Sequence, residues 1–171
     1  MPNLNGTRTN KHTARYTHSV TEPRSPIPAI RDSETLLRRV PPSWYPDKSR
    51  PDRPSFDVFL PKRWVSEKER GDHNGLSVNR EWFTTRTKVA IHPDTKKKQH
   101  VVQTSVSLLH GINLSVVEDY QDDDLSHALI PEINSLDYKN DKEKKKWIKY
   151  IARKIALDLC EMVYICPTNG D

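Results

Sequence analysis

The chain has 171 residues, of which 34% are hydrophobic and 30% are charged, and it contains thirteen prolines against five glycines. This length fits one domain with a tail and leaves little room for two full cores. No stretch approaches the roughly 20 apolar residues of a membrane-spanning helix, and the composition also excludes collagen-like and fully coiled-coil proteins. We therefore expect a protein that does not enter a membrane.

The charge is unevenly distributed along the chain, although its net value is only +5. Residues 118–141 contain eight acids and one lysine, whereas residues 142–154 contain seven bases and one acid. Blocks of like charge are typical of solvated faces or docking surfaces. The basic excess favours an acidic protein or nucleic acid as the partner.

The cysteines and the first residues indicate the compartment. Cys160 and Cys166 are the only two cysteines, fewer than a secreted scaffold of this size normally carries. The first twenty residues lack the apolar core of a signal peptide. We therefore expect a cytoplasmic protein in a reducing environment.

Residues 1–32 predict a basic tail that is disordered on its own. They contain four prolines and few large apolar side chains, so they cannot bury enough surface to offset the entropy lost on ordering. The run SPIPAI (25–30) is suited to docking in an extended form, because proline restricts φ. A compact domain is expected over residues 33–167, followed by a short tail over residues 168–171.

The first elements of the domain are short. Residues 33–40 form either a helix after Ser33 or a first strand, and the two prolines that follow end it. Residues 41–54 predict an extended segment because they contain five prolines. The alternation of apolar residues over 55–60 indicates a half-buried strand.

The middle of the chain predicts mostly strands. Val, Ser and Thr in residues 101–106 favour a strand, followed by a short helix over residues 105–110 that ends at Gly111. One helix over residues 101–110 is the alternative. Further strands are predicted for residues 75–80, 88–93 and 114–118, a helical turn or strand edge for 81–87, and a short strand or turn for 126–133.

The C-terminal stretch 141–165 gives the clearest helix. Asn140 followed by Glu143 matches a capping box, and the apolar positions recur with helical spacing along one stripe. The residues of this stripe are Ile148, Ile151, Ile155, Leu159 and Met162. Together the elements predict an α+β protein with a small, mostly antiparallel sheet, a long C-terminal amphipathic helix and a disordered N-terminal tail.

Sequence motifs for catalysis and metal binding are missing. The chain has no glycine-rich phosphate loop, no GxSxG nucleophile turn, no HExxH motif and no CxxC pair. His110, His127 and the acids at 122–124 match no ligand spacing, so an acidic surface turn with His127 at the start of a strand is the favoured interpretation. We therefore predict no bound metal, no cofactor and no catalytic residue.

The loop GDHNG (71–75) is the most site-like turn. It places Asp72, His73 and Asn74 between two glycines, and Ser77 follows on a strand. A His–Asp pair can act as a general base. Surface loops commonly have this composition as well, so a plain solvated turn is the favoured interpretation.

Arg38 and Arg39 form a second candidate. Adjacent residues on a strand point to opposite faces, so only one of them would face a pocket, where a guanidinium can clamp a phosphate or carboxylate. The alternative is one arginine in solvent and the other in an ion pair. A pocket that contains these arginines and Ser77 is the alternative hypothesis: a small transferase or hydrolase that uses a nucleotide or NAD. Its catalytic carboxylate could be either Glu118 or Glu132.

The lysine-rich start of the C-terminal helix is the third candidate. Lysines there oppose the helix macrodipole, which prefers anions, so the placement indicates an anionic partner or the chain's own acidic run 118–141. The favoured hypothesis is a non-enzymatic accessory or interaction protein that docks on an acidic protein or nucleic acid. The residues expected to make the contacts are Arg8, Lys11, Arg15, Lys142, Lys144, Lys145, Lys146 and Lys149.

Four short pieces of the chain carry a resemblance. LLRRVPP (36–42), RPS with the phenylalanine after it (53–56), GLSVNR (75–80) and SHALI (126–130) resemble a set of short bacterial proteins without an assigned activity. The resemblance implies a bacterial or phage origin and one compact α+β domain. It implies no functional residue.

Overall fold

The computed structural model describes residues 27–41, 53–61, 72, 74–92, 95–120 and 124–163. All structural statements below concern these residues. The predictions for residues 1–26, with Arg8, Lys11 and Arg15, for His73 and for Cys166 lie outside them.

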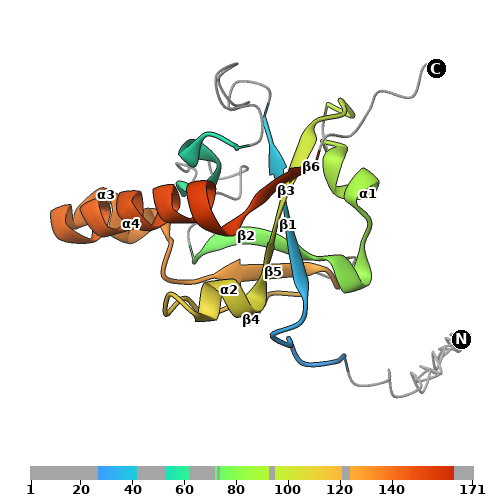
Figure 1. Cartoon of the computed structure of the whole chain (residues 1–171), viewed down its shortest axis with the longest axis horizontal. Coiled ribbons are helices and arrows are strands. Elements are labelled where there is room, and N and C mark those ends of the chain that lie inside the picture. The colour runs from blue at the N-terminus through green and yellow to red at the C-terminus, as the bar shows by residue number, and fades with distance from the viewer. Residues whose placement is uncertain are drawn as a thin grey trace, which may run out of the picture.

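The described residues build one antiparallel sheet of six strands, in the order β4-β5-β2-β1-β3-β6. The predicted fold class is therefore confirmed (Figure 1). The strands are β1 (Thr35–Val40), β2 (Leu76–Arg80), β3 (His100–Ser105), β4 (Val117–Glu118), β5 (His127–Ile130) and β6 (Glu161–Val163).

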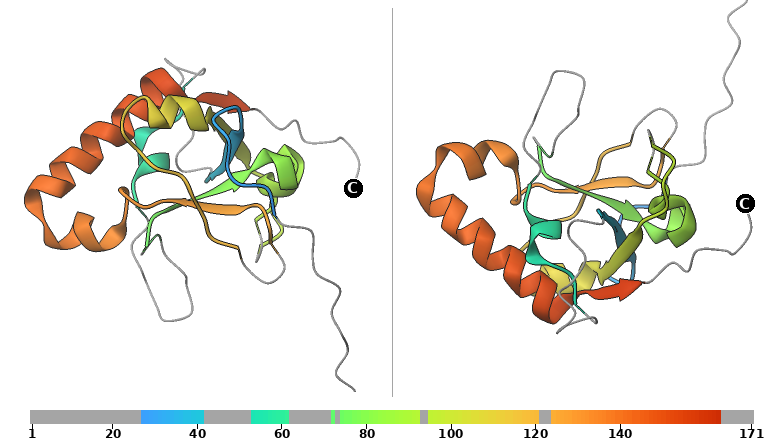
Figure 2. Two further views of the ribbon diagram at one scale, coloured as in Figure 1. Left: turned by 90° about the horizontal axis from the view of Figure 1, so that it is seen from below. Right: turned by 90° about the horizontal axis from the view of Figure 1, so that it is seen from above.

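Helices cover both faces of the sheet (Figure 2). The helical elements are η2 (Phe56–Phe59), η3 (Glu81–Phe83), α1 (Arg86–Ala90), α2 (Val106–His110), α3 (Ser135–Asn140), α4 (Lys142–Lys154) and the π-helical turn η4 (Ile155–Leu159). Helix α4, η2 and α2 pack on one face, which we call the core face, and α1 packs on part of the other face.

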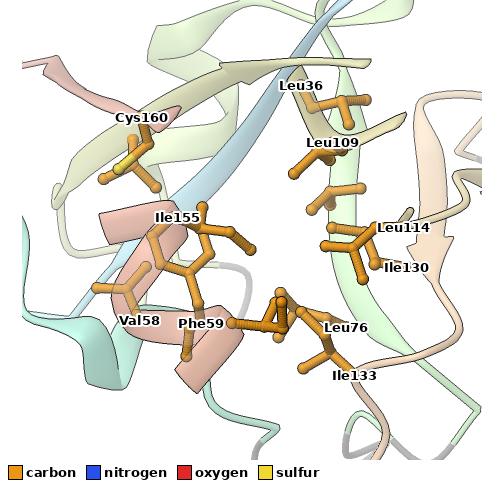
Figure 3. Close-up of a cluster of buried hydrophobic side chains, with 14 of the residues drawn as sticks. Leu36, Val58, Phe59, Leu76, Leu109, Leu114, Ile130, Ile133, Ile155 and Cys160 are labelled. Carbon is orange, nitrogen blue, oxygen red and sulfur yellow. The ribbon is translucent and has the colours of Figure 1, made fainter. Parts of the chain in front are cut away.

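The side chains of β1 divide the apolar residues into two clusters, because successive residues of a strand point to opposite faces. Leu36 and Val40 join the large cluster on the core face, together with Phe59 and Ile155 (Figure 3). Leu37 joins a small cluster that α1 covers on the opposite face. Burial of the large cluster stabilises the fold mainly through the hydrophobic effect.

Several predicted elements are confirmed. Residues 35–40 form the strand rather than the helix that the sequence left open, and residues 100–105 form a strand followed by α2. Ser105 caps α2 by accepting a hydrogen bond from the N–H of Leu108. His127 begins β5, as the interpretation of the acidic turn requires.

Two predicted strands are wrong. Residues 56–59 form the 3-10 helix η2, because the Ser55 hydroxyl accepts a hydrogen bond from the N–H of Asp57 and starts a helical turn. Residues 88–90 lie in α1, which Thr85 caps through the N–H of Lys88. A short apolar alternation does not distinguish a strand from one capped helical turn.

The C-terminal helix is shorter than predicted. Asp141, not Asn140, is its N-cap and accepts hydrogen bonds from the N–H groups of Glu143 and Lys144. Asn140 instead ends α3, which the sequence analysis did not predict. The helix loosens into η4 and ends at Cys160, so Met162 lies on β6 and not on the helical stripe.

Part of the predicted tail contacts the domain. The side chain of Ile30 packs against the main core, and the Asp32 carboxylate lies 2.7 Å from Nδ1 of His110 on α2. Across the described part of the chain, none of the helices combines the length and the apolar character needed to cross a membrane.

We predict that Gly75→Ala destabilises the protein. Gly75 has φ of +156°, and a Cβ atom there would lie 2.9 Å from the carbonyl oxygen of Ile130, so β2 or β5 must shift. The free energy of unfolding should fall by about 1–3 kcal/mol, measured by urea denaturation. Gly111→Ala is the matched control, because Gly111 has φ of −60° and its Cβ would meet nothing closer than 3.4 Å. Equal stability of the two variants would contradict this account.

Candidate functional site

A buried ion pair fills the space between β1 and β2. These strands pair at Leu36 with Arg80 and at Leu37 with Asn79. Beyond that point, the guanidinium of Arg38 donates from Nη1 to the carbonyl oxygen of Ser77 and from Nη2 to Asp72 Oδ2, at 3.2 Å for the second bond. Asp72 Oδ1 in turn accepts from the N–H of Ser77 at 2.9 Å. Both backbone groups of Ser77 on this side are thus satisfied by side chains instead of by a neighbouring strand.

Each guanidinium nitrogen of Arg38 already donates a hydrogen bond within the protein. Its Nε donates to the carbonyl oxygen of Val58 in η2 at 2.6 Å, and its two terminal nitrogens serve Ser77 and Asp72. The side chain is 6% exposed and that of Asp72 is 3% exposed. The pair therefore acts as a connector between β1, β2 and η2, and Asp72 is not a solvated loop residue.

A second buried arginine, which the sequence analysis missed, lies at the end of β2. Arg80 is fully buried and makes a bidentate contact with Glu34, from Nε to Oε2 at 2.8 Å and from Nη2 to Oε1 at 2.7 Å. It also donates to the carbonyl oxygen of Pro28 at 2.9 Å and to the hydroxyl of Tyr120 at 3.0 Å. The ring of Phe83 lies 4.8 Å from its guanidinium. Arg80 thereby ties the segment before β1 to the segment after β4.

The ion pair shifts the protonation equilibria of both partners. Burial alone would raise the pKa of Glu34, but the hydrogen bonds from Arg80 and from the N–H of Arg31 outweigh burial and hold that pKa below its ordinary value. The hydrogen bonds to Glu34 raise the pKa of Arg80. Both groups therefore stay charged at neutral pH.

A polar row crosses three strands on the face opposite the core. Because Asn79 pairs with His127 and Leu37 pairs with Asn79, the side chains of Ser77, His127 and Arg39 share that face. Nε2 of His127 lies 3.2 Å from Ser77 Oγ. Its Nδ1 lies 3.0 Å from the carboxylate Oδ2 of Asp119 and 3.0 Å from the Asp119 carbonyl oxygen. The imidazole of His127 thus contacts the Ser77 hydroxyl on one side and the Asp119 carboxylate on the other.

The predicted arginine pair is separated as strand geometry requires. Arg38 points to the core face, whereas Arg39 points to the opposite face and donates from Nε to the carbonyl oxygen of Val89 at 2.8 Å. Ser77 meets Arg38 through its backbone carbonyl only, and its hydroxyl points to the side of Arg39. The structure therefore brings Ser77 and Arg39 to one face and leaves Arg38 on the other.

The basic surface is carried by α4 and the end of α3. Residues 139–154 contain eight lysines and arginines and two acids. The amino-terminal end of α4 projects away from the sheet together with α3 (Figures 1 and 2). We call the surface of this projection the basic face. Its residues are Lys142, Lys144, Lys145, Lys146, Trp147, Lys149 and Tyr150, and the side chains of Lys144 and Lys145 contact α3.

The acidic run neutralises only part of the basic face. Lys144 Nζ lies 2.6 Å from Asp137 Oδ2, a contact that lowers the pKa of Asp137 and raises that of Lys144 through their hydrogen bond. Lys146 pairs with Glu143 at 2.8 Å on the exposed surface. Lys142 and Lys149 make no ion pair within the described residues. Exposed pairs of this kind contribute about 0–1 kcal/mol each, so an anionic ligand can displace them.

Two aromatic side chains lie among these lysines. Tyr150 is 62% exposed and Trp147 is 40% exposed. Ile148 and Ile151 of the same helix are buried in the core. Much of the surface of Trp147, by contrast, lies in solvent.

Neither metal ligation nor thiol chemistry is indicated by the described residues. They contain no group of three or more His, Cys, Asp or Glu side chains arranged to hold a metal ion. Burial raises the pKa of the Cys160 thiol to about 12, and this thiol lies 3.6 Å from the carbonyl oxygen of Ala156. A thiol in this environment is a poor nucleophile at neutral pH.

In comparisons with known proteins, no family model matches this chain, and no curated protein and no solved structure is significantly similar to it.

We predict that Glu34→Gln lowers stability and flattens its dependence on acid. The folded-state pKa of Glu34 lies below its unfolded value, so the stabilisation is complete above the unfolded pKa and is lost as the pH falls through the folded pKa. At pH 7 the variant should lose roughly 3 kcal/mol, because Arg80 keeps its charge without its main partner. Urea denaturation between pH 3 and pH 7 measures both effects.

Glu143→Gln is the control for this experiment. Glu143 makes only an exposed pair with Lys146, so this variant should stay within about 1 kcal/mol of the wild-type protein and keep its pH profile. A Glu34→Gln profile parallel to that of the wild-type protein would show that the Glu34–Arg80 pair does not control acid stability.

Proposed function

We propose that the protein binds single-stranded nucleic acid through the basic face of α4. The observation that carries the proposal is the exposure of Tyr150 and Trp147 among five lysines on one projecting helix. Proteins that bind single strands combine cations that follow the phosphates with aromatic rings on which bases stack. This face presents both groups.

Electrostatics supports an anionic ligand. Lysines in the first turns of α4 oppose the helix macrodipole, and five of them lie within eight residues. The intramolecular partners, Asp137 and Glu143, satisfy two of these lysines. A polyanion would relieve the repulsion among the rest and release its counterions, which makes binding favourable at low salt.

The aromatic side chains favour nucleic acid over an acidic protein. Every base has a face that stacks on a tyrosine or tryptophan ring, at about 1–3 kcal/mol per base, whereas an acidic peptide needs only the lysines. The alternative hypothesis of a nucleotide pocket that contains both Arg38 and Ser77 has less support. Each guanidinium nitrogen of Arg38 already donates to Val58, Ser77 or Asp72, and the side chain is only 6% exposed.

We predict that binding to a labelled oligothymidine depends on Lys142 and Lys149. The variant Lys142→Gln/Lys149→Gln should bind more weakly. The slope of log K against log salt should fall by about 1.4, because each phosphate contact on a single strand contributes about 0.7. Fluorescence anisotropy at several salt concentrations measures this.

Lys88→Gln/Lys97→Gln is the matched control, because it removes the same charge from exposed residues outside α4. An equal loss in both double variants would exclude a specific role of α4. If the full chain ignores oligothymidine at low salt but binds polyglutamate with the same dependence on Lys142 and Lys149, an acidic protein is the partner instead.

We predict that Tyr150→Ala weakens oligothymidine binding roughly tenfold, the loss of one stacked base, whereas Tyr150→Phe retains wild-type affinity. Tyr150 is mostly exposed, so neither variant should change the melting temperature by more than a few degrees. Trp82→Ala, at an aromatic residue that is 60% exposed outside α4, should bind like the wild-type protein. Unchanged affinity of Tyr150→Ala would contradict base stacking on α4.

A further inference from the structure

The polar row on the face opposite the core is independent of α4 and has the connectivity of an activated serine. Nδ1 of His127 is 3.0 Å from two oxygens of Asp119, a carboxylate and a carbonyl. A backbone carbonyl oxygen can only accept a hydrogen bond, so Nδ1 is the nitrogen that donates. In the neutral imidazole, Nε2 then presents its lone pair to Ser77 Oγ at 3.2 Å, and the serine hydroxyl donates to it.

Three adjacent strands hold this arrangement in place. Ser77 lies on β2, His127 on β5, and Asp119 directly follows β4, where its N–H donates to the carbonyl oxygen of His127 at 3.2 Å. The imidazole side chain is 15% exposed and that of Asp119 is 46% exposed. Ser77 and His127, which lie on strands, are therefore positioned more precisely than Asp119, which lies outside the strands.

The backbone of Ser77 is fixed separately from its hydroxyl. Arg38 and Asp72 hold the Ser77 carbonyl and N–H on the β1 side, so the position of the serine backbone does not depend on its hydroxyl. Because the N–H of Ser77 donates to Asp72, it does not serve a developing oxyanion. Arg39 lies on the same face of β1 and donates to the carbonyl oxygen of Val89.

The residues beside Ser77 indicate the substrate class. Leu129 pairs with Ser77 across β2 and β5, and Val117 pairs with Leu129 across β5 and β4. Paired residues share a face, so Leu129, which is buried, and Val117, which is 40% exposed, lie on the same face as the serine side chain. A short apolar acyl chain bound at Ser77 would pack against Val117.

We propose that Ser77, His127 and Asp119 form a catalytic triad that hydrolyses carboxylic esters with a short apolar acyl chain. Ser77 Oγ attacks the ester carbonyl carbon while His127 Nε2 takes its proton. The bond to the leaving alcohol breaks, and the alcohol receives that proton. Water then attacks the acyl–Ser77 carbon and gives a proton to Nε2, and this proton returns to Ser77 Oγ as the acid leaves.

The test uses two probes on the full chain. An alkyl fluorophosphonate, which loses fluoride as Ser77 Oγ bonds to phosphorus, should label the protein once, and peptide mass spectrometry should place the label on Ser77. p-Nitrophenyl butyrate should be hydrolysed with release of p-nitrophenolate. Ser77→Ala should lose both reactions, and His127→Gln should slow both at least about 100-fold, the contribution of a positioned general base.

Matched variants separate catalysis from folding. Ser115→Ala, at an exposed serine outside the row, should react like the wild-type protein, and all variants should keep the wild-type melting temperature. Asp119 is a positioning residue. Asp119→Asn should slow labelling of Ser77 and Asp119→Glu should restore part of the rate, whereas a merely structural carboxylate would change the melting temperature without this pattern.

Three results would overturn the proposal. The first is a folded wild-type protein that the fluorophosphonate does not label. The second is equal labelling of Ser77→Ala, which would place the reaction on another residue. The third is a His127→Gln variant that labels at the wild-type rate with an unchanged melting temperature, which would show that the histidine does not activate the serine.

Discussion

The salt bridge between Arg38 and Asp72 is the constraint on which the arrangement of the sheet depends. It replaces the backbone hydrogen bonds that β1 would otherwise make to Ser77, and it anchors η2 through the Val58 carbonyl. An arginine can do this because its planar group donates in three directions at once. Breaking such a buried pair typically costs about 3–5 kcal/mol. The pair therefore fixes both the position of η2 and the backbone of Ser77.

The same chemistry appears again at Arg80, and together the two arginines explain why a chain with few large apolar residues holds a sheet of six strands. Each guanidinium connects segments that are far apart in sequence: Arg80 joins Pro28, Glu34 and Tyr120. The apolar cluster supplies the driving force, and the arginines determine which segments lie beside one another. The lysines of α4 do not connect distant segments in this way: Lys144 and Lys146 pair with Asp137 and Glu143, and Lys145 lies over the ring of Tyr138.

Strand β3 could be predicted because Val, Ser and Thr favour strands, whereas β1 stayed open between a strand and a helix. Strand β2 could be predicted because its side chains alternate between buried and half-buried positions. Residues 55–60 show the same alternation, but one hydroxyl cap at Ser55 makes them helical. The burial of Arg38 and Arg80 could not be predicted from the sequence, because a charged residue in a strand is expected to be exposed to solvent unless its partner is known. The contact of Ser77 with His127 joins residues fifty positions apart, and only the order of the strands brings them together. The lysines of α4, by contrast, could be recognised from the sequence because five of them lie within eight consecutive residues.

The two edges of the described sheet are its shortest strands, β4 with two residues and β6 with three. A long, flat edge would expose a row of unpaired amide and carbonyl groups and invite another chain to extend the sheet. Here each margin offers only a few such groups, and Val117 and Glu118 at one of them alternate an aliphatic with a charged side chain. The short edge strands therefore disfavour polymerisation through backbone hydrogen bonds, so that contacts with other molecules would have to use side chains.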